Sequence, residues 1–524
     1  MANQPTSLTA LLRASADARH FPFLERATFW EERLALHSAD LQTLLDAPAG
    51  TDMFTLPPRV APEVHAAVLA TKVAERSEEI CMASVREIAT RVRSKEISPV
   101  EVAKAHLERA QSREHLKAFI TMRPETVIKQ AQALEARIAR GEDVGALAGV
   151  PVAVKDLMHV AGYPFTCGTN AMDGKESETD ADVVALLRRA GAIVIGTANL
   201  HELAYGVTSA NEHFGAVQNP TVPGHIPGGS SGGSGAAVAA GLAAIGVGTD
   251  TGGSIRIPAA CCGVTGFKPT HDAVSRAGCW PLADTLDHIG PLTRNVADAA
   301  LAFEVMAGLQ AGTIGGLRID APRLVKPAPF FYDQLDTSVR TCTHAAIQQL
   351  QSAGASVEDR RIEGVEYAPA VQFMTLCPEA CQTNWDLLTK RGNRVSADVR
   401  VRLEIGQFIG AIDYVKAQRL RRWIRDNLIV GLKDADVFIV PTLPISIPLQ
   451  GMRTVSLGGR TLPLPGAMTR LTGPFNFAGL PALSIPCGTD DKGCPVSLQL
   501  VGRPGADATV LAVGQWAEKV LSGR

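Results

Sequence analysis

Two glycine-rich segments that carry serines are the places where this chain could do chemistry. The first is GGSSGG at 228–233, and the second is TDTGGS at 249–254. Glycine loses more backbone entropy on folding than any other residue, so loops this rich in it serve some purpose other than packing a core. Such loops let backbone N–H groups come close to a ligand, and a serine within them is a candidate nucleophile.

Phosphate binding is poorly supported by these and other glycines. The P-loop pattern needs Gly-Lys followed by Ser or Thr, but Gly174 and Lys175 are followed by Glu176. The dinucleotide pattern G-x-G-x-x-G fails as well, because the match that starts at Gly246 has Thr251 in its sixth position. We therefore expect no nucleotide site.

The segment GGSSG at 228–232 matches the hydrolase pattern G-x-S-x-G in form but not in context. That pattern requires a preceding strand and a histidine late in the chain. Here the preceding NPTVPGHIP holds three prolines, and the last histidine is His344. No serine has a lysine three positions later, which also excludes the S-x-x-K arrangement. A serine nucleophile would therefore need another base.

Lys155 is the best candidate for that base. It follows the apolar run GVPVAV at 149–154, which would carry its side chain into the interior. Burial disfavours the ammonium form, so a buried lysine can be neutral and basic near neutral pH. The alternative is a structural lysine that pairs with Asp156 at the end of a strand, and the residues alone leave that alternative open.

Five segments of the chain resemble the amidase signature family, and they occur in that family's order from about Met82 to the C-terminus. The segments are GVPVAVKD, GGSSGGSGAAVAAG, GTDTGGSIRIPAACCGVTGFKPT, TLDHIGPLTRNVADAA and FNFAGLPALSIPCG. The resemblance implies a serine amidohydrolase without a metal or other cofactor. It also implies a single large α/β/α domain in which helices cover a central twisted mixed β-sheet.

The resemblance assigns roles to individual residues. It implies a Ser–Ser–Lys triad in which Lys155 is the base, Ser230 the bridge and Ser254 the nucleophile that forms an acyl-enzyme. In that family the bridging serine lies on a cis peptide bond. The oxyanion is expected to bind the backbone N–H groups of Thr251, Gly252 and Gly253.

Further polar residues near these segments are expected to support the loops. Asp250 would accept hydrogen bonds from the loop, with Arg256 as its partner, and Ser231 resembles another supporting position. We expect Asp287 to form a turn. The histidines nearest the matching segments have no metal-ligand spacing, so we expect no catalytic role for them; they are His159, His201 and His225.

The elements that must position these residues alternate in type. SVREIATRVRS and DADVVALLRRAG have helical periodicity, whereas VPVAVKD and AIVIGTA are typical of strands. This alternation predicts an α/β architecture. The later apolar runs VFIVPT and ALSIPCG complete one large domain, residues 82–524, if they join the same sheet.

Residues 1–81 have a different character. Their apolar residues recur at three- and four-residue spacing, and the proline-rich stretch PAGTDMFTLPPRVAPE joins them to the rest. We expect an N-terminal helical extension that packs on the α/β body and takes part in a homodimer contact.

Composition limits the partners and the compartment that we expect. The 524 residues are 46% hydrophobic, and their formal net charge of −2 comes without a basic block, which argues against nucleic acid or an anionic membrane. The ten cysteines form no C-x-x-C pair, and the first thirty residues have no apolar signal core. These features predict a reduced, cytoplasmic protein.

Two functions remain after this reasoning. The first is an amidase that acts, as a homodimer, on a small-molecule linear carboxamide, an aryl amide or a urea-like compound. The alternative is one member of a multiprotein amidotransferase, a chain that resembles the A subunit of glutamyl-tRNA amidotransferase. We prefer the first because no basic cluster is visible. Apolar residues that could line a pocket are Met172, Trp280, Phe373, Met374, Trp385, Leu443 and Ile445.

Overall fold

The computed structural model describes residues 76–523. Most of the predicted N-terminal extension lies outside this range, so its helices and its part in a dimer stay predictions. Ile80 and Cys81, at the end of that extension, are buried in the same apolar cluster as Val85 and Ile88. No helix in the described range is long and apolar enough to cross a membrane.

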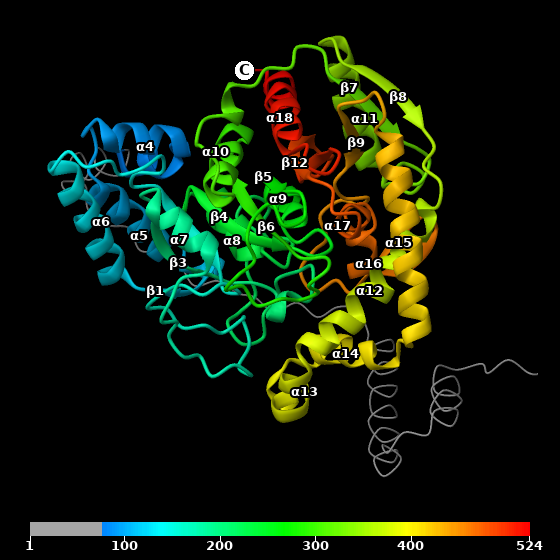
Figure 1. The fold of residues 1–524 in the computed structure, drawn as a ribbon, viewed down its shortest axis with the longest axis horizontal. Coiled ribbons are helices and arrows are strands. Elements are labelled where there is room, and N and C mark those ends of the chain that lie inside the picture. Colours follow the sequence, from blue (N-terminus) through cyan, green and yellow to red (C-terminus); the bar gives the residue numbers. More distant parts are fainter. Residues whose placement is uncertain (1–75, 524) are drawn as a thin grey trace, which may run out of the picture. The chain divides into compact units, whose positions relative to one another are not determined.

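One mixed β-sheet runs through the described part of the chain (Figure 1). Its eleven strands lie side by side in the order β1-β3-β2-β4-β6-β5-β12-β13-β9-β7-β8. In chain order the strands are β1 (Phe119–Met122), β2 (Pro151–Lys155), β3 (Ile193–Ala198), β4 (Ile245–Asp250), β5 (Thr265–Lys268), β6 (His288–Thr293), β7 (Arg323–Pro327), β8 (Ser356–Arg360), β9 (Val437–Pro441), β12 (Ala482–Thr489) and β13 (Pro495–Val501).

The sheet is parallel in two places and antiparallel between them and at the β1 edge. Strands β3, β2 and β4 are parallel neighbours, as are β9, β7 and β8, and the strands from β4 to β9 pair antiparallel. The late strands β9 and β12 therefore join the same sheet as the early strands β2 and β3. The predicted α/β class with a central mixed sheet is confirmed.

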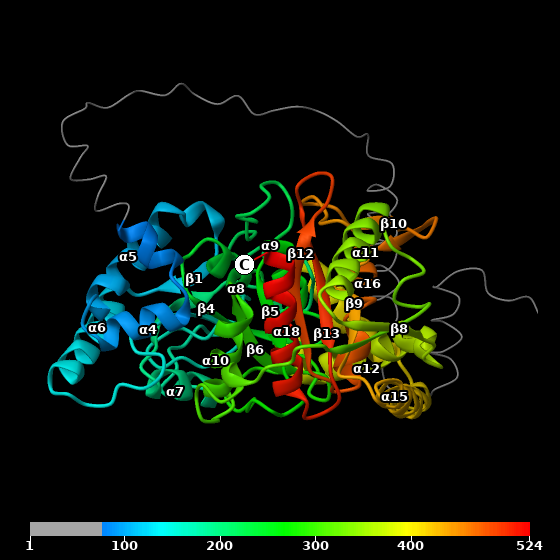
Figure 2. The same ribbon diagram turned by 90° about the horizontal axis from the view of Figure 1, so that it is seen from above.

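Helices cover the sheet in two layers (Figures 1 and 2). On one side α10 and α18 pack against each other and against β6 and β12, and on the other α8 and α9 pack together against β4 and β5. The α-helices are α4 (Val85–Arg93), α5 (Pro99–Ser112), α6 (Pro124–Ala139), α7 (Asp182–Arg189), α8 (Gly232–Ala239), α9 (Arg256–Cys262), α10 (Val296–Met306), α11 (Thr337–Ser352), α12 (Ala368–Thr383), α13 (Trp385–Arg391), α14 (Ala397–Ile405), α15 (Ala411–Gly431), α16 (Leu464–Thr469), α17 (Gly473–Phe477) and α18 (Asp507–Ser522). A separate hairpin joins β10 (Thr454–Leu457) to β11 (Arg460–Pro463).

The alternation of side chains along β2 decides where its last residue points. Val152 and Val154 belong to the apolar cluster that contains α10, whereas Ala153 packs in the cluster that contains α8. Because successive strand residues face opposite sides of a sheet, Lys155 lies on the face of Ala153. All of β2 is buried, as expected for a strand with parallel neighbours on both sides.

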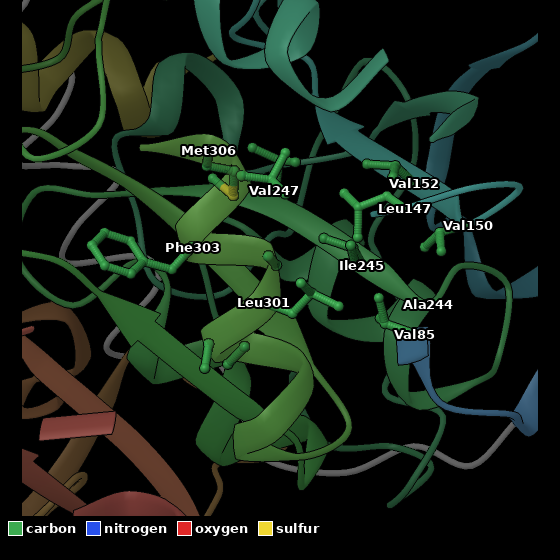
Figure 3. Close-up of a cluster of buried hydrophobic side chains, with 14 of the residues drawn as sticks. Val85, Leu147, Val150, Val152, Ala244, Ile245, Val247, Leu301, Phe303 and Met306 are labelled. Atoms are coloured by element: carbon green, nitrogen blue, oxygen red, sulfur yellow. The ribbon is translucent and has the colours of Figure 1, made fainter. Parts of the chain in front are cut away.

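The α10 face of the same strands is apolar over residues 152–154 and 245–247 (Figure 3). Val152 of β2 and Ile245 and Val247 of β4 lie in one cluster with Leu301 and Met306 of α10. This packing holds β2 and β4 against α10. The opposite face, at the ends of these two strands, is left for polar chemistry.

Candidate active site

Lys155 ends β2 and is completely buried. Its Nζ donates hydrogen bonds to three hydroxyl oxygens: Ser230 Oγ at 2.7 Å, Ser231 Oγ at 3.0 Å and Thr249 Oγ1 at 2.7 Å. Burial lowers the pKa of Lys155 to about 7, because the ammonium form loses its hydration. A substantial neutral fraction of this lysine therefore exists at neutral pH.

Lys155 does not pair with the carboxylate next to it in sequence. Asp156 instead accepts hydrogen bonds from the Thr166 hydroxyl and, at 3.4 Å, from the Gly168 N–H. Burial raises the pKa of Asp156 to about 7. The alternative of a structural Lys155–Asp156 pair is therefore not what the structure shows.

The first serine loop passes directly over the end of β2. The peptide bond between Gly229 and Ser230 is cis. The carbonyl oxygen of Ser230 accepts hydrogen bonds from the His201 N–H at 3.1 Å and from the Ser209 hydroxyl at 3.2 Å. These bonds fix the loop backbone, and the Ser230 hydroxyl is the one that receives the bond from Lys155.

Glycines in β4 allow this loop and α8 to lie against the strand. A Cβ at Gly246 would lie 2.8 Å from the Ser234 carbonyl oxygen, and one at Gly248 would lie 2.9 Å from Ser231 Oγ. Both distances are too short for a real side chain. Glycine at these two positions therefore permits the close approach of the serine loop that the sequence suggested.

The second serine loop follows β4 and meets the first. The Ser231 N–H donates to the Ser254 carbonyl oxygen at 3.2 Å, which ties the two loops together. Ser254 keeps 7% of its surface exposed and lines a cavity of about 450 Å³. Ser254 is thus the member of the predicted triad that a substrate in this cavity would reach.

The turn before Ser254 offers backbone donors to the same cavity. Thr251 and Gly252 line the cavity, and their N–H groups have no acceptor within the described residues. The N–H of Gly253, which we also expected to be an oxyanion donor, instead donates to Asp250 Oδ1 at 2.7 Å. We therefore leave Gly253 out of the proposed donor set.

Gly253 has a different task in this turn. Its φ is +135°, and a Cβ there would lie 2.4 Å from Thr472 Oγ1. Only glycine fits this conformation and this space. Gly253 shapes the turn, and Thr251 and Gly252 present the free donors.

Asp250 and Arg256 form a buried ion pair beneath the turn. Both are fully buried, and Arg256 donates to Asp250 through Nε and Nη2, each at 3.0 Å. Arg256 also donates to Gln499 Oε1 at 2.9 Å and to Asn476 Oδ1 at 2.6 Å. Burial alone would raise the pKa of Asp250, but the Arg256 charge and the hydrogen bonds that Asp250 accepts from Arg256 and from Asn476 Nδ2 hold that pKa below its ordinary value.

Asp287 fixes the side chain of Thr251. Asp287 Oδ1 accepts the Thr251 hydroxyl at 2.6 Å, and Oδ2 accepts the Leu282 N–H at 2.8 Å. Burial raises the pKa of Asp287 to about 6. The carboxylate that the sequence indicated only as a turn former thus also contacts the proposed oxyanion turn.

The three histidines near the matching segments have other contacts. The His159 ring is hydrogen-bonded to Ser177 Oγ at 2.8 Å, and the His201 ring lies 3.5 Å from Asp398. His225 Nδ1 lies 3.3 Å from the Pro223 carbonyl oxygen.

The cavity is mostly apolar, with a few polar groups. Of the apolar residues that we expected to line it, Phe373 does so, whereas Leu443 and Ile445 pack in a separate core cluster and Trp280 lines a smaller neighbouring cavity. The residues that line the main cavity are Ala204, Tyr205, Gly206, Val207, Thr251, Gly252, Ser254, Leu282, Ala368, Pro369, Gln372, Phe373, Leu376, Cys377, Arg402, Ile405, Pro463, Pro465, Gly466, Thr469, Arg470, Gly473 and Pro474.

Sequence reasoning missed the residues that hold the site from a distance. Thr249 supplies the third oxygen around Lys155, and its only signal was its place between Gly248 and Asp250 at the end of a strand. Gln372 and Thr472 donate to the carbonyl oxygens of Thr251 and Gly252, at 3.0 Å and 2.6 Å. No local pattern marks these two, because they lie more than a hundred residues from the turn.

Known proteins are similar to this chain over most of its length. The amidase family model matches residues 101–511. The A subunit of the glutamyl-tRNA(Gln) amidotransferase of Carboxydothermus hydrogenoformans is 35% identical over 481 residues, which cover 84% of this chain and 98% of that protein.

Solved structures give the same result. A crystal structure of an amidase superimposes with a TM-score of 0.80 at 35% identity and covers 84% of this chain and all of the other. A second structure, described as a vestigial protein complex that reveals the origins of an s-triazine catabolic enzyme, has a TM-score of 0.78 at 33% identity. It covers 84% of this chain and 98% of its own.

These relatives correct one of our predictions. We expected a homodimer that acts on a small-molecule amide without nucleic acid. That expectation is wrong, because the curated relatives are subunits of an amidotransferase named for glutamyl-tRNA(Gln). Net charge and the absence of a basic block did not reveal this kinship.

The segments that resembled the amidase signature family thus lie together in the fold, around a buried lysine and two serine loops. The family match spans most of the chain, and relatives above 30% identity cover more than four fifths of it. This chain belongs to the amidase family, whose general chemistry is cleavage of the amide C–N bond.

Proposed function

We propose that this chain is the amide-cleaving component of an amidotransferase that contains at least one further, different protein chain. Support for the assembly comes from curated relatives at 35% and 36% identity that are named as the A subunit of such an enzyme. A structural relative at 33% identity is described as a protein complex. The observation that carries the chemical part is Lys155, which is buried, has a pKa of about 7 and is bonded to Ser230.

The first step is attack on the carboxamide carbon. Neutral Lys155 accepts the proton of the Ser230 hydroxyl, and Ser230 in turn accepts the proton of Ser254. The Ser254 oxygen forms a bond to the carbonyl carbon, and the C=O electron pair moves to oxygen. The N–H groups of Thr251 and Gly252 stabilise that oxyanion, and each such donor typically lowers the barrier by about 3 kcal/mol.

The second step releases the nitrogen. The proton held by Lys155 returns through Ser230 to the leaving nitrogen, the C–N bond breaks, and ammonia departs from an acyl-Ser254 ester. Water then adds to the ester carbon and gives up a proton along the same path, so that the carboxylic acid leaves and the serine is restored. In the complex the released ammonia is the nitrogen that the amidotransferase reaction transfers.

A test must separate cleavage from transfer. The purified chain is compared with the complex isolated from its source cells, with a heavy-nitrogen-labelled carboxamide as donor and glutamyl-tRNA as acceptor. We expect both preparations to release labelled ammonia and only the complex to place the label on the acceptor. Ammonia release without any transfer by the complex would contradict the amidotransferase proposal.

A second candidate function is plain hydrolysis, in which water takes the acyl group and no acceptor takes the ammonia. The structural relative described simply as an amidase, with a TM-score of 0.80, favours it. The same labelling experiment distinguishes the two functions. Loss of ammonia release in Ser254→Ala is expected for both, and ammonia release that survives this change would contradict both.

A further inference from the structure

Two cysteines meet where helix α11 packs against strand β12. Cys342 of α11 and Cys487 of β12 are 145 positions apart, and the Sγ of Cys342 lies 3.9 Å from the Cys487 carbonyl oxygen. The two thiols are also hydrogen-bonded to each other. Both residues are free cysteines that keep part of their surface exposed. Two thiols from distant parts of the chain are therefore in contact at a place that a small reagent in solution can reach.

The backbone of β12 is shaped for this contact. Strand β12 pairs regularly with β13 up to Pro486 and again from Gly488, which leaves Cys487 as the extra residue of a β-bulge. The φ of Gly488 is +146°, and a Cβ there would lie only 2.7 Å from Cys342 Sγ. Glycine at this position therefore permits the close approach of Cys342 to the bulged part of the strand.

The two thiols differ in acidity. The hydrogen bond with Cys487 lowers the pKa of Cys342, and it outweighs partial burial and the nearby Asp490 charge, which both raise that pKa. The same hydrogen bond and burial raise the pKa of Cys487. The thiolate is the form of cysteine that attacks an oxidant. Cys342 is therefore the better nucleophile, and Cys487 lies beside it as a second sulfur that can complete a disulfide.

The other eight cysteines lack this combination of contact, exposure and acidity. Seven of them are buried, and only Cys279 is partly exposed. A raised pKa keeps a cysteine in the thiol form, which reacts slowly with oxidants. Burial raises the pKa of all eight, which are Cys81, Cys167, Cys261, Cys262, Cys279, Cys377, Cys381 and Cys494.

We propose that Cys342 and Cys487 form a redox modification site, at which a peroxide converts the two thiols into a disulfide that joins α11 to β12. The site is separate from the proposed function, because no step of amide cleavage uses either cysteine.

The reaction has two steps. The Cys342 thiolate attacks one oxygen of hydrogen peroxide, the O–O bond breaks, and the departing hydroxide takes up the proton that Cys342 had lost, which leaves a sulfenic acid on Cys342. The Cys487 sulfur then attacks the Cys342 sulfur, the S–O bond breaks, and hydroxide departs as water with the Cys487 proton. Together the two thiols lose two electrons and two protons, and the peroxide is reduced to two molecules of water.

The experiment treats the reduced full-length chain with hydrogen peroxide under native conditions. The remaining thiols are then alkylated in denaturant, and disulfides are mapped by mass spectrometry of a non-reduced digest. We expect two of the ten thiols to be lost together, in a linked peptide pair that contains Cys342 and Cys487 and that dithiothreitol separates. Loss of the other thiols at the same rate, or a link that forms only in denatured protein, would overturn the proposal.

Single variants test the order of the two steps. Cys487→Ser removes the second sulfur, so peroxide should leave a sulfenic acid on Cys342 that dimedone labels. Cys342→Ser removes the nucleophile and should slow the loss of thiols at least about tenfold. Cys494→Ser changes a buried cysteine in the turn between β12 and β13, and as the matched control it should leave the link unchanged. Dimedone labelling of Cys487 in Cys342→Ser at the wild-type rate of thiol loss would contradict the assigned order.

A stability measurement on the wild type needs no variant. A disulfide between residues so far apart in sequence restricts the unfolded chain strongly, and here it would join groups that are already in contact. The urea midpoint of the peroxide-treated chain should therefore lie above that of the reduced chain and return to it after dithiothreitol. A midpoint that falls on oxidation would overturn the proposal, because it would mean that the link forms only by disrupting the packing of α11 on β12.

Discussion

Two buried basic side chains lie at the ends of neighbouring strands or just beyond them, and they differ in their hydrogen-bond partners. Lys155, at the end of β2, contacts three neutral hydroxyl groups and no carboxylate. Arg256, just after β4, forms a two-point bond to Asp250 and further bonds to Gln499 and Asn476. Both side chains are fully buried.

This difference distinguishes the proposed base from the side chains that support the turn. A buried charge that is paired and fully hydrogen-bonded stays in one protonation state. The lowered pKa of Asp250 shows that its pairing with Arg256 favours the carboxylate form. A buried amine without a counter-ion has a pKa near neutrality and can exchange a proton during a reaction. The Asp250–Arg256 pair therefore holds the turn, while Lys155 is the side chain that our proposed mechanism uses as the base.

A third buried basic side chain shows that burial alone does not make a lysine the base of a reaction. Lys268 of β5 is also fully buried, and burial lowers its pKa well below the ordinary value. Its Nζ donates to the carbonyl oxygens of Leu480 and Pro269, which have no proton to give. Lys155 differs because each of its three partners is a hydroxyl group.

The largest expected effect follows from removing the unpaired amine. Lys155→Met should lower kcat/KM for amide cleavage by about ten thousandfold, since residues of a catalytic triad act as a unit. Lys268→Met is the matched control and should keep activity within about tenfold of wild type, because no step uses it. Comparable losses in the two folded variants would remove the distinction between these lysines.

Breaking the ion pair should instead show in stability. Asp250→Asn leaves the Arg256 charge buried without compensation, which typically costs about 3 to 5 kcal/mol. We expect that loss in the free energy of unfolding measured by urea denaturation, and no comparable loss in Lys155→Met. If Asp250→Asn were as stable as wild type, the supporting role of the pair would be wrong.

The stability of the wild type should also depend on pH through Lys155. The unfolded lysine has a pKa of about 10.4 and the folded one a pKa of about 7, so the unfolded state binds the proton more tightly. The destabilising contribution of Lys155 is therefore complete below pH 7, and it disappears as the pH rises toward 10.

In that interval the free energy of unfolding should rise by up to about 1.4 kcal/mol per pH unit from this residue. Urea denaturation of wild type and Lys155→Met across the interval measures it. The stability advantage of the methionine variant should shrink as the pH increases. A constant difference between the two proteins would contradict the low pKa.

The smallest effect is expected from Thr249→Val, which preserves shape and removes one acceptor from Lys155. Loss of that hydrogen bond disfavours the ammonium form, so the midpoint of the pH–rate profile should move to a lower pH. We expect kcat above the midpoint to fall by about tenfold or less. A midpoint that moves upward would show that Thr249 does not stabilise the charged lysine.

Much of the fold could be predicted from the sequence, because the patterns of strands and helices are local. The run before Lys155 and the run at 193–198 were recognisable as strands, and both lie in the sheet. The two serine loops were recognisable because glycine marks close approach of the backbone. Local spacing also predicted that Asp250 accepts hydrogen bonds from its loop, but not that one of them comes from the Gly253 N–H, which we expected to be an oxyanion donor.

The remaining site residues are joined by tertiary packing. Lys155 and Thr249 are 94 positions apart, and Thr251 and Gln372 are 121 positions apart. No periodicity links such pairs, and only the paired strands and the packing of α12 bring them together. The kinship with amidotransferase subunits was equally invisible, because net charge does not report the shape of a surface that could bind another chain.

The most direct test of the account is the pH dependence of the acylation step. In single-turnover experiments with an amide, the wild-type rate should rise with pH, reach half its maximum near the Lys155 pKa of about 7 and then level off, as neutral lysine becomes available. In Lys155→Met the residual rate should not rise with pH in this way. A wild-type rate that stays flat from about pH 5 to about pH 9, or a limb that persists unchanged in the variant, would show that another group is the base.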